Sequence, residues 1–403
     1  MKFIFAPDSY KGTFSSLELV QLLKESASRV FPGCETIGIP IADGGEGTLE
    51  AVLPAVNGEY RCAPVRDPLS RDITAKYGVF GCSALIEMAS ASGLALVPAE
   101  RRNPLETSSY GTGQLILDAL ESGCRDIYVA VGGSATNDGG IGAMKALGVR
   151  FLDAAGNELN GTGADLLRIR SIDRSRLSPL ARGAKFHLMC DVTNPLLGPD
   201  GATYVYGPQK GAGKEELELL EKGMAHYAEI AERELKIPIR SAAGAGAAGG
   251  MGAALIGFLN AEIRSGIETV LELVRFEELL QETDLVVTGE GRVDFQSACG
   301  KVISGIARLC RRHAVPVAVI AGEMGRGAED VYGIGVASIM VTVSRAESAG
   351  EAAANAKADF ISASQRMFRL LKLGMEIGGK SRCGRPFPTP RTGGSVDVKS
   401  GSF

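Results

Sequence analysis

The chain has 403 residues, of which 45% are hydrophobic and 22% charged, an ordinary composition for a globular protein of about two domains. Its 43 basic and 47 acidic residues give a formal net charge of −4, which excludes an overall basic field for nucleic acid or an anionic membrane. Its three histidines lack metal-ligand spacing and its eight cysteines are scattered without a C-x-x-C pair, which argues against a zinc site and a disulfide framework. Because the N-terminal apolar run is too short for a signal peptide and no stretch has the length of a membrane span, we expect a cytoplasmic protein.

The first two strands are predicted at residues 2–6 and 36–42. Short apolar runs bounded by Gly, Pro or Asp are typical of buried parallel strands. Between the two runs, Ser15 and Glu18 form a capping-box pair at the start of an amphipathic helical pattern. This order predicts a βαβ unit.

Three further strands are predicted near the other end of the chain, at residues 285–288, 315–321 and 337–343. Together with the first two strands they would complete a five-stranded parallel sheet, so the fold class is α/β and one domain is built from both chain ends. We predict that this domain comprises residues 1–65 and 285–377. Residues 66–284 would form an inserted second α/β domain, with a strand at 127–131 and helices around 115–121 and 217–235.

The last segment, residues 378–403, is rich in Gly, Pro, Ser and basic residues and has no apolar periodicity. Such a composition cannot bury enough apolar surface to offset the entropy of ordering, so we predict a disordered tail.

Polar residues follow the predicted strands of the first domain. Ligands of open parallel sheets bind beyond the carboxyl ends of the strands. The residues at these ends are Asp8 and Ser9, then Asp43, Gly44 and Gly45, then Gly289, Glu290 and Arg292, and finally Glu323. Asp and Gly also make good turns, and each site alone has that simpler interpretation. Four carboxylates at one edge repel each other unless a cation lies among them, which favours Mg²⁺ carrying a nucleotide.

A second glycine-rich loop, residues 132–140, follows the strand predicted at 127–131 and precedes a helical pattern. This arrangement places backbone N–H groups and the positive end of a helix dipole at one point, which suits a phosphate or a carboxylate. A tight strand-to-helix turn is an equally good interpretation. The candidate binding residues in this loop are Gly132, Gly133, Ser134 and Asn137.

Two motif matches lack the structural context that they require. Residues 374–381 fit the phosphate-binding pattern G-x-x-x-x-G-K-[ST], but they follow a helical pattern and not a strand. Gly244, Gly246 and Gly249 fit G-x-G-x-x-G, but the preceding segment is a poor strand. A dinucleotide site is therefore the alternative and not the preferred interpretation.

Several long motifs are more specific than the hydrophobic and glycine patterns described so far. They are, by first residue, PDSYKGTFSS (7), IPIADGGEGTLEA (39), IEMASASGLALVP (86), TSSYGTGQLI (107), VGGSATNDGGIGAMKALG (131), CDVTNPLLGPDGA (190), YGPQKGA (206), GAGAAGGMGAAL (244) and TGEGRVDFQSACGK (288). In this order, over roughly residues 1–377, the chain resembles the type-1 glycerate kinase family. Phe295 and Cys299 depart from the family pattern, which more often has a hydroxyl residue and a His there.

The resemblance implies a flavodoxin-like parallel-sheet domain built from both chain ends, with the second α/β domain inserted and the active site in the cleft between them. It also implies ATP-dependent phosphorylation of D-glycerate with Mg²⁺, and 2-phosphoglycerate as the expected product. The expected partners are these small molecules, with no nucleic acid and no membrane, and a homo-oligomer is left open.

Phosphoryl transfer depends on positioning and on neutralising phosphate charge, and this guides the assignment of roles. The expected catalytic residues are Lys11, Asp191 and Arg292, with Asp191 either the base that accepts the hydroxyl proton or the cap of a turn. Asp43 and Glu290 are the candidate metal ligands. The residues expected to bind substrate or phosphate are Asp8, Ser9, Asp43, Gly44, Gly45, Gly132, Gly133, Ser134, Asn137, Lys210, Gly289 and Glu290.

Overall fold

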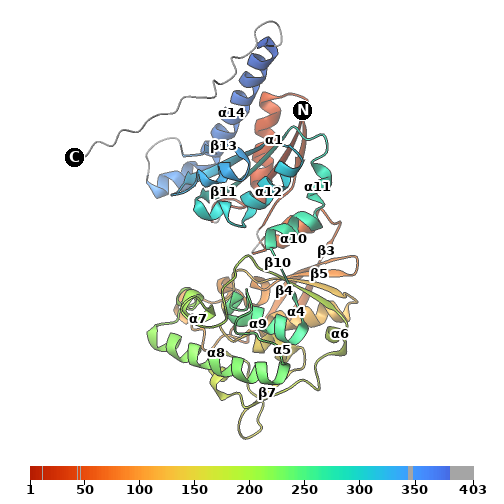
Figure 1. The fold of residues 1–403 in the computed structure, drawn as a ribbon, viewed down its shortest axis with the longest axis vertical. Coiled ribbons are helices and arrows are strands. Elements are labelled where there is room, and N and C mark those ends of the chain that lie inside the picture. The colour runs from red at the N-terminus through yellow and green to blue at the C-terminus, as the bar shows by residue number, and fades with distance from the viewer. Residues whose placement is uncertain (11, 43, 46, 344–347, 382–403) are drawn as a thin grey trace, which may run out of the picture.

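Two large sheets organise the chain (Figure 1). The computed structural model describes residues 1–381 apart from residues 11, 43, 46 and 344–347. The first sheet has the order β13-β12-β11-β1-β2, and each of its ladders is parallel. Its strands are β1 (Lys2–Pro7), β2 (Glu35–Gly38), β11 (Leu285–Val293), β12 (Val317–Met324) and β13 (Val336–Val341). The predicted α/β fold with a sheet built from both chain ends is therefore confirmed.

Side chains of β1 alternate between the two faces of this sheet, as they must in a strand. Phe3 and Phe5 pack with helices α1 (Ser16–Val30) and α14 (Ala349–Ser381). Ile4 lies in a second cluster, together with residues of α12 (Val302–Arg312). The capping box of α1 is present as predicted, with the Ser15 side chain and Glu18 bonded to each other's backbone N–H groups. Helices thus cover both faces and leave the carboxyl ends of the strands for ligands.

The second sheet has six strands in the order β10-β9-β6-β5-β4-β3. Its parallel part consists of β5, β6, β9 and β10, and β3 and β4 are added in antiparallel orientation. The strands are β3 (Glu59–Arg66), β4 (Asp72–Phe80), β5 (Ser83–Glu87), β6 (Asp126–Ala130), β9 (Lys185–Met189) and β10 (Glu262–Arg264). Of these strands only β6 was predicted. Strands β3 and β10 are largely exposed, and β5 and β9 are buried but only five residues long, which is too short for periodicity to separate a strand from a helix.

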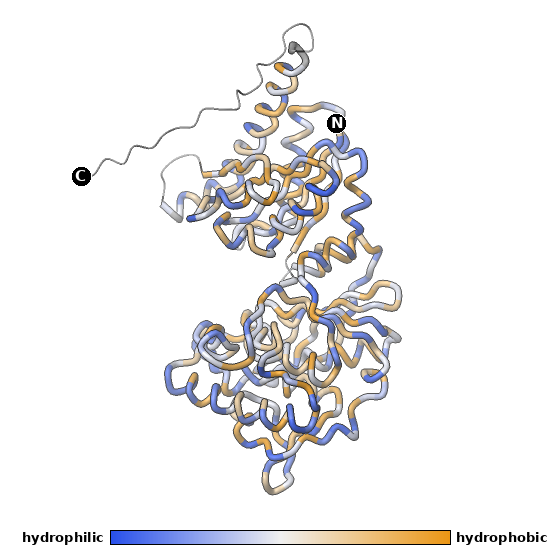
Figure 2. The backbone as a smooth tube through the Cα atoms, viewed as in Figure 1, coloured by the Kyte–Doolittle hydropathy of each residue, from blue (hydrophilic) through white to orange (hydrophobic). Residues whose placement is uncertain are grey.

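Helices accompany the second sheet in the lower half of Figure 1. They include α4 (Tyr110–Glu121), α5 (Ile141–Ala146), α7 (Ala202–Tyr206), α8 (Lys214–Leu235) and α9 (Ala247–Leu259). Strands β7 (Arg150–Leu152) and β8 (Ser171–Asp173) follow α5 in the chain and form a small antiparallel sheet of their own. In Figure 2 the apolar segments run through the strands of both halves, where the cores lie.

Two helices lie between the sheets, α2 (Thr48–Val52) and α10 (Gly266–Leu273). One hydrophobic cluster contains Leu49 of α2 and Ile267 of α10, and it also contains Leu85, Tyr128 and Met189 from the second sheet. The halves are thus joined by apolar packing as well as by the chain. None of the helices in the described part of the chain combines the length and apolarity needed to cross a membrane.

The ladders and the packing support domain boundaries that differ by several residues from the predicted ones. Strand β3 pairs with β4, so the second sheet begins before residue 65. Helix α10 packs with α12, so the first domain resumes before residue 285. We propose boundaries near residues 58 and 265. Helix α14 continues to Ser381, so the predicted tail begins later than residue 378, and residues 382–403 lie outside the described residues.

Candidate functional site

The two glycine motifs that the sequence singled out meet between the sheets. Gly132 follows β6, and a Cβ atom added to it would lie only 2.7 Å from the Cα atom of Gly45. Gly44 has a φ of +83°, and a Cβ atom there would lie 3.0 Å from the Cα atom of Gly266 at the start of α10. Side chains at these positions would separate the two backbones. We call the contact of Gly44 and Gly45 with Gly132 and Gly266 the glycine junction.

A groove runs along the strand ends on both sides of the glycine junction. One hollow of ≈ 340 Å³ is lined by Asp191 and also by Gly45 and Gly132. The next contains Asp8 and Ser9 together with the same two glycines. A third, of ≈ 610 Å³, shares Asp8 and Ser9 and reaches the ends of β11 and β12. The neighbouring hollows share residues, so they form one groove that draws on both domains.

Most of the predicted site residues line this groove. They are Asp8, Ser9, Gly44, Gly45, Gly132, Gly133, Ser134, Asp191, Lys210, Glu290 and Arg292. Lys11 and Asp43 lie outside the described residues. Gly289 and Asn137 do not line these hollows. A Cβ on Gly289 would lie 2.0 Å from the Ile320 carbonyl oxygen of the neighbouring strand, and Asn137 is fully buried with its amide donating to Thr203 Oγ1. For these two residues the structure supports packing roles.

Carboxylates gather at the end of the groove that belongs to the first sheet. Asp8, Glu290 and Glu323 line the same hollow. Asp8 Oδ1 accepts a hydrogen bond from Ser9 N at 2.7 Å, and Glu290 Oε1 accepts one from Ser297 Oγ. Arg292 is largely exposed, and its Nη1 lies 3.4 Å from Glu323 Oε1. The side chain of Lys301 lines this hollow too.

The carboxylates of this hollow have the chemistry of Mg²⁺ ligands. Among the described residues, no group of three or more His, Cys, Asp or Glu side chains could hold a metal ion. Mg²⁺ in kinase sites needs only one or two carboxylates, because substrate phosphates and water supply the other ligands. Asp8 and Glu290 in one hollow fit a magnesium ion that arrives with a nucleotide, and they do not fit a cage made of protein side chains alone.

Asp191 holds the start of α10. Its Oδ1 accepts hydrogen bonds from Ser265 Oγ at 2.8 Å and from Gly266 N at 2.9 Å. The capping interpretation of Asp191 thus has direct support, although the helix that it caps is α10 and not the turn that follows Asp191 in the chain. Because Asp191 also lines the groove, the contact joins the end of β9 to a helix of the first domain.

A buried polar cluster supports loop 132–140 from behind. Asp138 is fully buried and accepts hydrogen bonds from Ser109 N and Oγ and from the N–H groups of Gly140 and Gly142. Burial raises the pKa of Asp138, and these hydrogen bonds oppose that shift. Lys210 is 2% exposed, and its Nζ donates to the Thr136 carbonyl oxygen at 2.7 Å. Burial lowers the pKa of Lys210 to about 7, and the charge of Asp138 partly offsets this. Burial of Lys210 therefore opposes its predicted role in neutralising phosphate charge, because it disfavours the charged form of the amine.

The remaining glycine motif packs against the same loop. Gly139 N donates to the Gly249 carbonyl oxygen at 2.9 Å. A Cβ on Gly250 would lie 2.6 Å from the Cα of Gly139. Within residues 236–246 no strand precedes this motif, so it lacks the strand, turn and helix of a dinucleotide site. Residues 374–381 likewise lie inside α14.

Sequence reasoning missed two buried carboxylates near the groove, Asp138 and Glu87. Both lie in motifs that carried the family resemblance, but neither was among the predicted site residues. Glu87 ends β5, which was not predicted. Asp138 lies inside the glycine loop, where it looks like an ordinary turn residue.

Two α/β halves that present glycine turns, carboxylates and basic side chains at one groove define a protein of the phosphate-binding α/β class. Comparisons with known proteins are more specific. Residues 3–372 match the model of the glycerate kinase family. The chain is 43% identical over 381 residues to the glycerate 2-kinase of Escherichia coli (strain K12), which covers 94% of this chain and 100% of that protein.

A second relative, the glycerate kinase of Bacillus subtilis (strain 168), is 45% identical over 345 residues, which cover 85% of this chain and 90% of that protein. The crystal structure of a glycerate kinase 2 from Salmonella typhimurium LT2 superposes with a TM-score of 0.82 at 41% identity, covering 93% of this chain and 99% of that one. The chain belongs to the glycerate kinase family.

Proposed function

We propose that the protein transfers the γ-phosphoryl group of ATP to D-glycerate, with Mg²⁺, in the groove at the glycine junction. The observation that carries this proposal is the contact of Gly45 with Gly132, because it joins the strand ends of both sheets into one groove. The relatives named as glycerate kinases support the substrate, and the name glycerate 2-kinase supports 2-phosphoglycerate as the product.

The nucleotide phosphates would lie at the end of the groove near the first sheet. Arg292 and Lys301 line that hollow beside Asp8 and Glu290, so cations are available for phosphate oxygens and carboxylates for a metal. Mg²⁺, when bound there, would neutralise the charge that builds up on the transferred group. Glu290 would hold it, together with Asp43 as a further prediction.

Glycerate would lie closer to the glycine junction. Ser9 and the backbone N–H groups of Gly132 and Gly133 line the middle hollow and could hold its carboxylate. Asp191 holds α10, whereas Asp8 lines both the middle hollow and the nucleotide hollow, so we assign the acceptor of the hydroxyl proton to Asp8 and leave the metal to Glu290 and Asp43. In this reaction positioning contributes more than proton removal.

An assay for ADP release tests the proposal. The protein should consume ATP only when D-glycerate and a divalent metal are both present, and the phosphate of the product should be on the 2-hydroxyl by ³¹P NMR. A dehydrogenase would instead change nicotinamide absorbance, and a binding protein for sugar acids would do neither. Absence of ADP release with D-glycerate over a panel of divalent metals would contradict the proposal.

A further inference from the structure

The geometry points to Glu87 as a positioning residue that holds α2, and with it the turn at Gly44 and Gly45, against the second sheet. This inference rests on the proposed function, because the turn forms one wall of the groove. Glu87 does not touch the reacting groups in this account. It acts through the backbone that it holds.

Glu87 is placed for this by its strand. It is the last residue of β5 and pairs with Ala130 of β6, two residues before Gly132. Leu85, two residues earlier, lies in the cluster between the sheets, and alternate residues of a strand share a face. The side chain of Glu87 therefore points from the second sheet towards α2. There its Oε1 accepts a hydrogen bond from Leu49 N at 2.8 Å.

A bond to helix α2 affects the groove because α2 directly follows the glycine turn. It begins at Thr48, directly after Gly47, whose φ of +92° ends the glycine turn. Leu49 is fully buried, so α2 cannot shift without disturbing the packing between the sheets. A carboxylate that fixes the first N–H groups of α2 thus limits where Gly45 lies relative to Gly132.

The same arrangement occurs a second time. Asp191, beyond the end of β9, accepts the Gly266 N–H at the start of α10. Gly266 contacts Gly44 in the glycine junction. Two carboxylates at strand ends of the second sheet therefore hold the two helices that lie between the sheets, and the glycine turn lies between those helices.

The bond depends on charge. Glu87 is 5% exposed, and burial raises its pKa to about 7, whereas the bond from Leu49 N opposes the rise. The groups around it are Glu50 of α2, which raises this pKa, and Lys76 of β4, which lowers it. Tyr60 of β3 and Asp8 also face this region. An ionised carboxylate accepts stronger hydrogen bonds than a protonated one, so the hold on α2 weakens as the pH falls through about 7.

Ionisation of Glu87 then has opposite effects on stability and on activity. Because the pKa of Glu87 is higher in the folded protein than in the unfolded chain, ionisation of Glu87 lowers the free energy of unfolding as the pH rises from about 4.5 to about 7. Glu87→Gln removes this loss and should be at least as stable as the parent at pH 8. A fall in its activity would therefore not come from unfolding.

The test compares Glu87→Gln and Glu87→Asp with Glu50→Gln, which changes a carboxylate on the same helix. In steady-state assays with D-glycerate and MgATP at pH 8, Glu87→Gln should lower kcat/KM by about 10-fold to 10²-fold, the scale of a small misplacement. Between pH 8 and pH 6 the kcat/KM of the parent should fall about 10-fold, and the kcat/KM of Glu87→Gln should not show this acid-side fall.

Two control variants complete the test. Glu87→Asp should keep the acid-side fall in kcat/KM, at a reduced kcat/KM throughout. Glu50→Gln should have a kcat/KM within about 2-fold of the parent at pH 8, and its acid-side fall should occur at lower pH.

Amide hydrogen exchange separates this inference from the proposed function. Residues 48–52 should exchange faster in Glu87→Gln than in Glu50→Gln, whether or not D-glycerate is the substrate. If the parent does not phosphorylate D-glycerate and residues 48–52 still exchange faster in Glu87→Gln, the role of Glu87 is retained and the substrate is overturned. The role of Glu87 would be overturned if Glu87→Gln had the same kcat/KM as the parent, the same fall in kcat/KM at acid pH and the same exchange rates in residues 48–52.

Discussion

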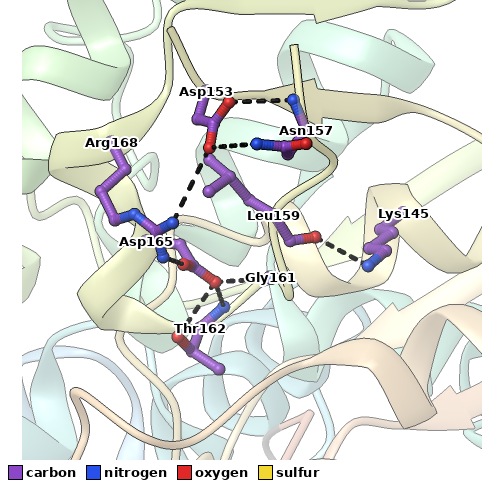
Figure 3. A network of polar contacts seen from close by, with 8 residues as sticks. All are labelled: Lys145, Asp153, Asn157, Leu159, Gly161, Thr162, Asp165 and Arg168. Atoms are coloured by element: carbon purple, nitrogen blue, oxygen red, sulfur yellow. Dashed lines mark hydrogen bonds and ion pairs between the residues drawn. The ribbon is translucent and has the colours of Figure 1, made fainter. Parts of the chain in front are cut away.

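Asp138 and Asp153 each accept hydrogen bonds from several backbone N–H groups, but they differ in burial. Asp138 accepts from backbone N–H groups of residues on both sides of it in the chain and is fully buried. Asp153 accepts from Ala155 N and Asn157 N, both at 2.9 Å, and its Oδ2 lies 3.9 Å from Arg168 Nη2 (Figure 3).

The pKa values move in opposite directions. Hydrogen bonds, first of all that from Asn157 N, lower the pKa of Asp153, whereas burial raises the pKa of Asp138 despite its bonds. The comparison teaches that burial, and not the number of hydrogen bonds, decides which carboxylate the fold depends on. The buried one supports loop 132–140, and the partly exposed one lies in a network near the surface around β7.

The largest effect is expected for Asp138→Ala. The substitution leaves buried N–H groups of Ser109 and Gly140 without an acceptor and removes the charge that faces Lys210. We expect a loss of roughly 3–5 kcal/mol in the free energy of unfolding, the usual cost of removing one partner of buried charges. Urea denaturation measures it. A loss below about 1 kcal/mol would show that burial does not make this carboxylate important.

Substitutions of Asp191 and Asp8 extend the comparison of carboxylates to the groove, where one is expected to hold a helix and the other to accept a proton. In Asp191→Asn the new Oδ1 can still accept from Ser265 Oγ and Gly266 N, so a capping role predicts activity within a few-fold of the parent. Asp8→Asn should lower kcat by about 10² to 10⁴, the usual contribution of general-base assistance. Assays at several Mg²⁺ concentrations exclude a metal effect, because loss of a ligand would be partly reversed by more metal. A deep fall in kcat for Asp191→Asn, with Asp8→Asn near the parent, would exchange the two roles.

The smallest effect is expected for Asp153→Ala. This carboxylate is partly exposed, so water reaches the groups that it binds, and its ion pair with Arg168 is long and screened. The urea midpoint of the variant should be hard to distinguish from that of the parent in the same titration as Asp138→Ala. A loss as large as that of Asp138→Ala would contradict the comparison.

The first sheet was predictable because its strands lie in apolar runs separated by helical patterns, and its three inner strands are largely buried. Strand β1, with α1 and its capping box, is the clearest case. The second sheet was mostly missed. Strand β3 is exposed at most positions, and its pairing with β4 depends on a partner that periodicity does not reveal.

The site divides in the same way. Residues after predicted strands, such as Asp8 and Gly132, could be placed at the groove from the sequence. The role of Asp191 could not, because its partner Gly266 lies 75 residues further along the chain. Glu87 was missed for a related reason, since a carboxylate that holds a distant helix has no local signature. Contacts between segments far apart in the sequence are the part of this site that the sequence alone did not give.

The central claim is that the active site exists because Gly45 and Gly132 touch. ADP release with D-glycerate and MgATP should be compared for the parent, for Gly132→Ala and for Gly183→Ala, where a Cβ atom would meet nothing closer than 3.8 Å. A Cβ on Gly132 would lie 2.7 Å from the Cα of Gly45 and must push the turn away. We predict that Gly132→Ala, still folded by circular dichroism, loses about 10²-fold or more in kcat/KM while Gly183→Ala keeps parental activity. Parental kcat/KM in Gly132→Ala would contradict the claim.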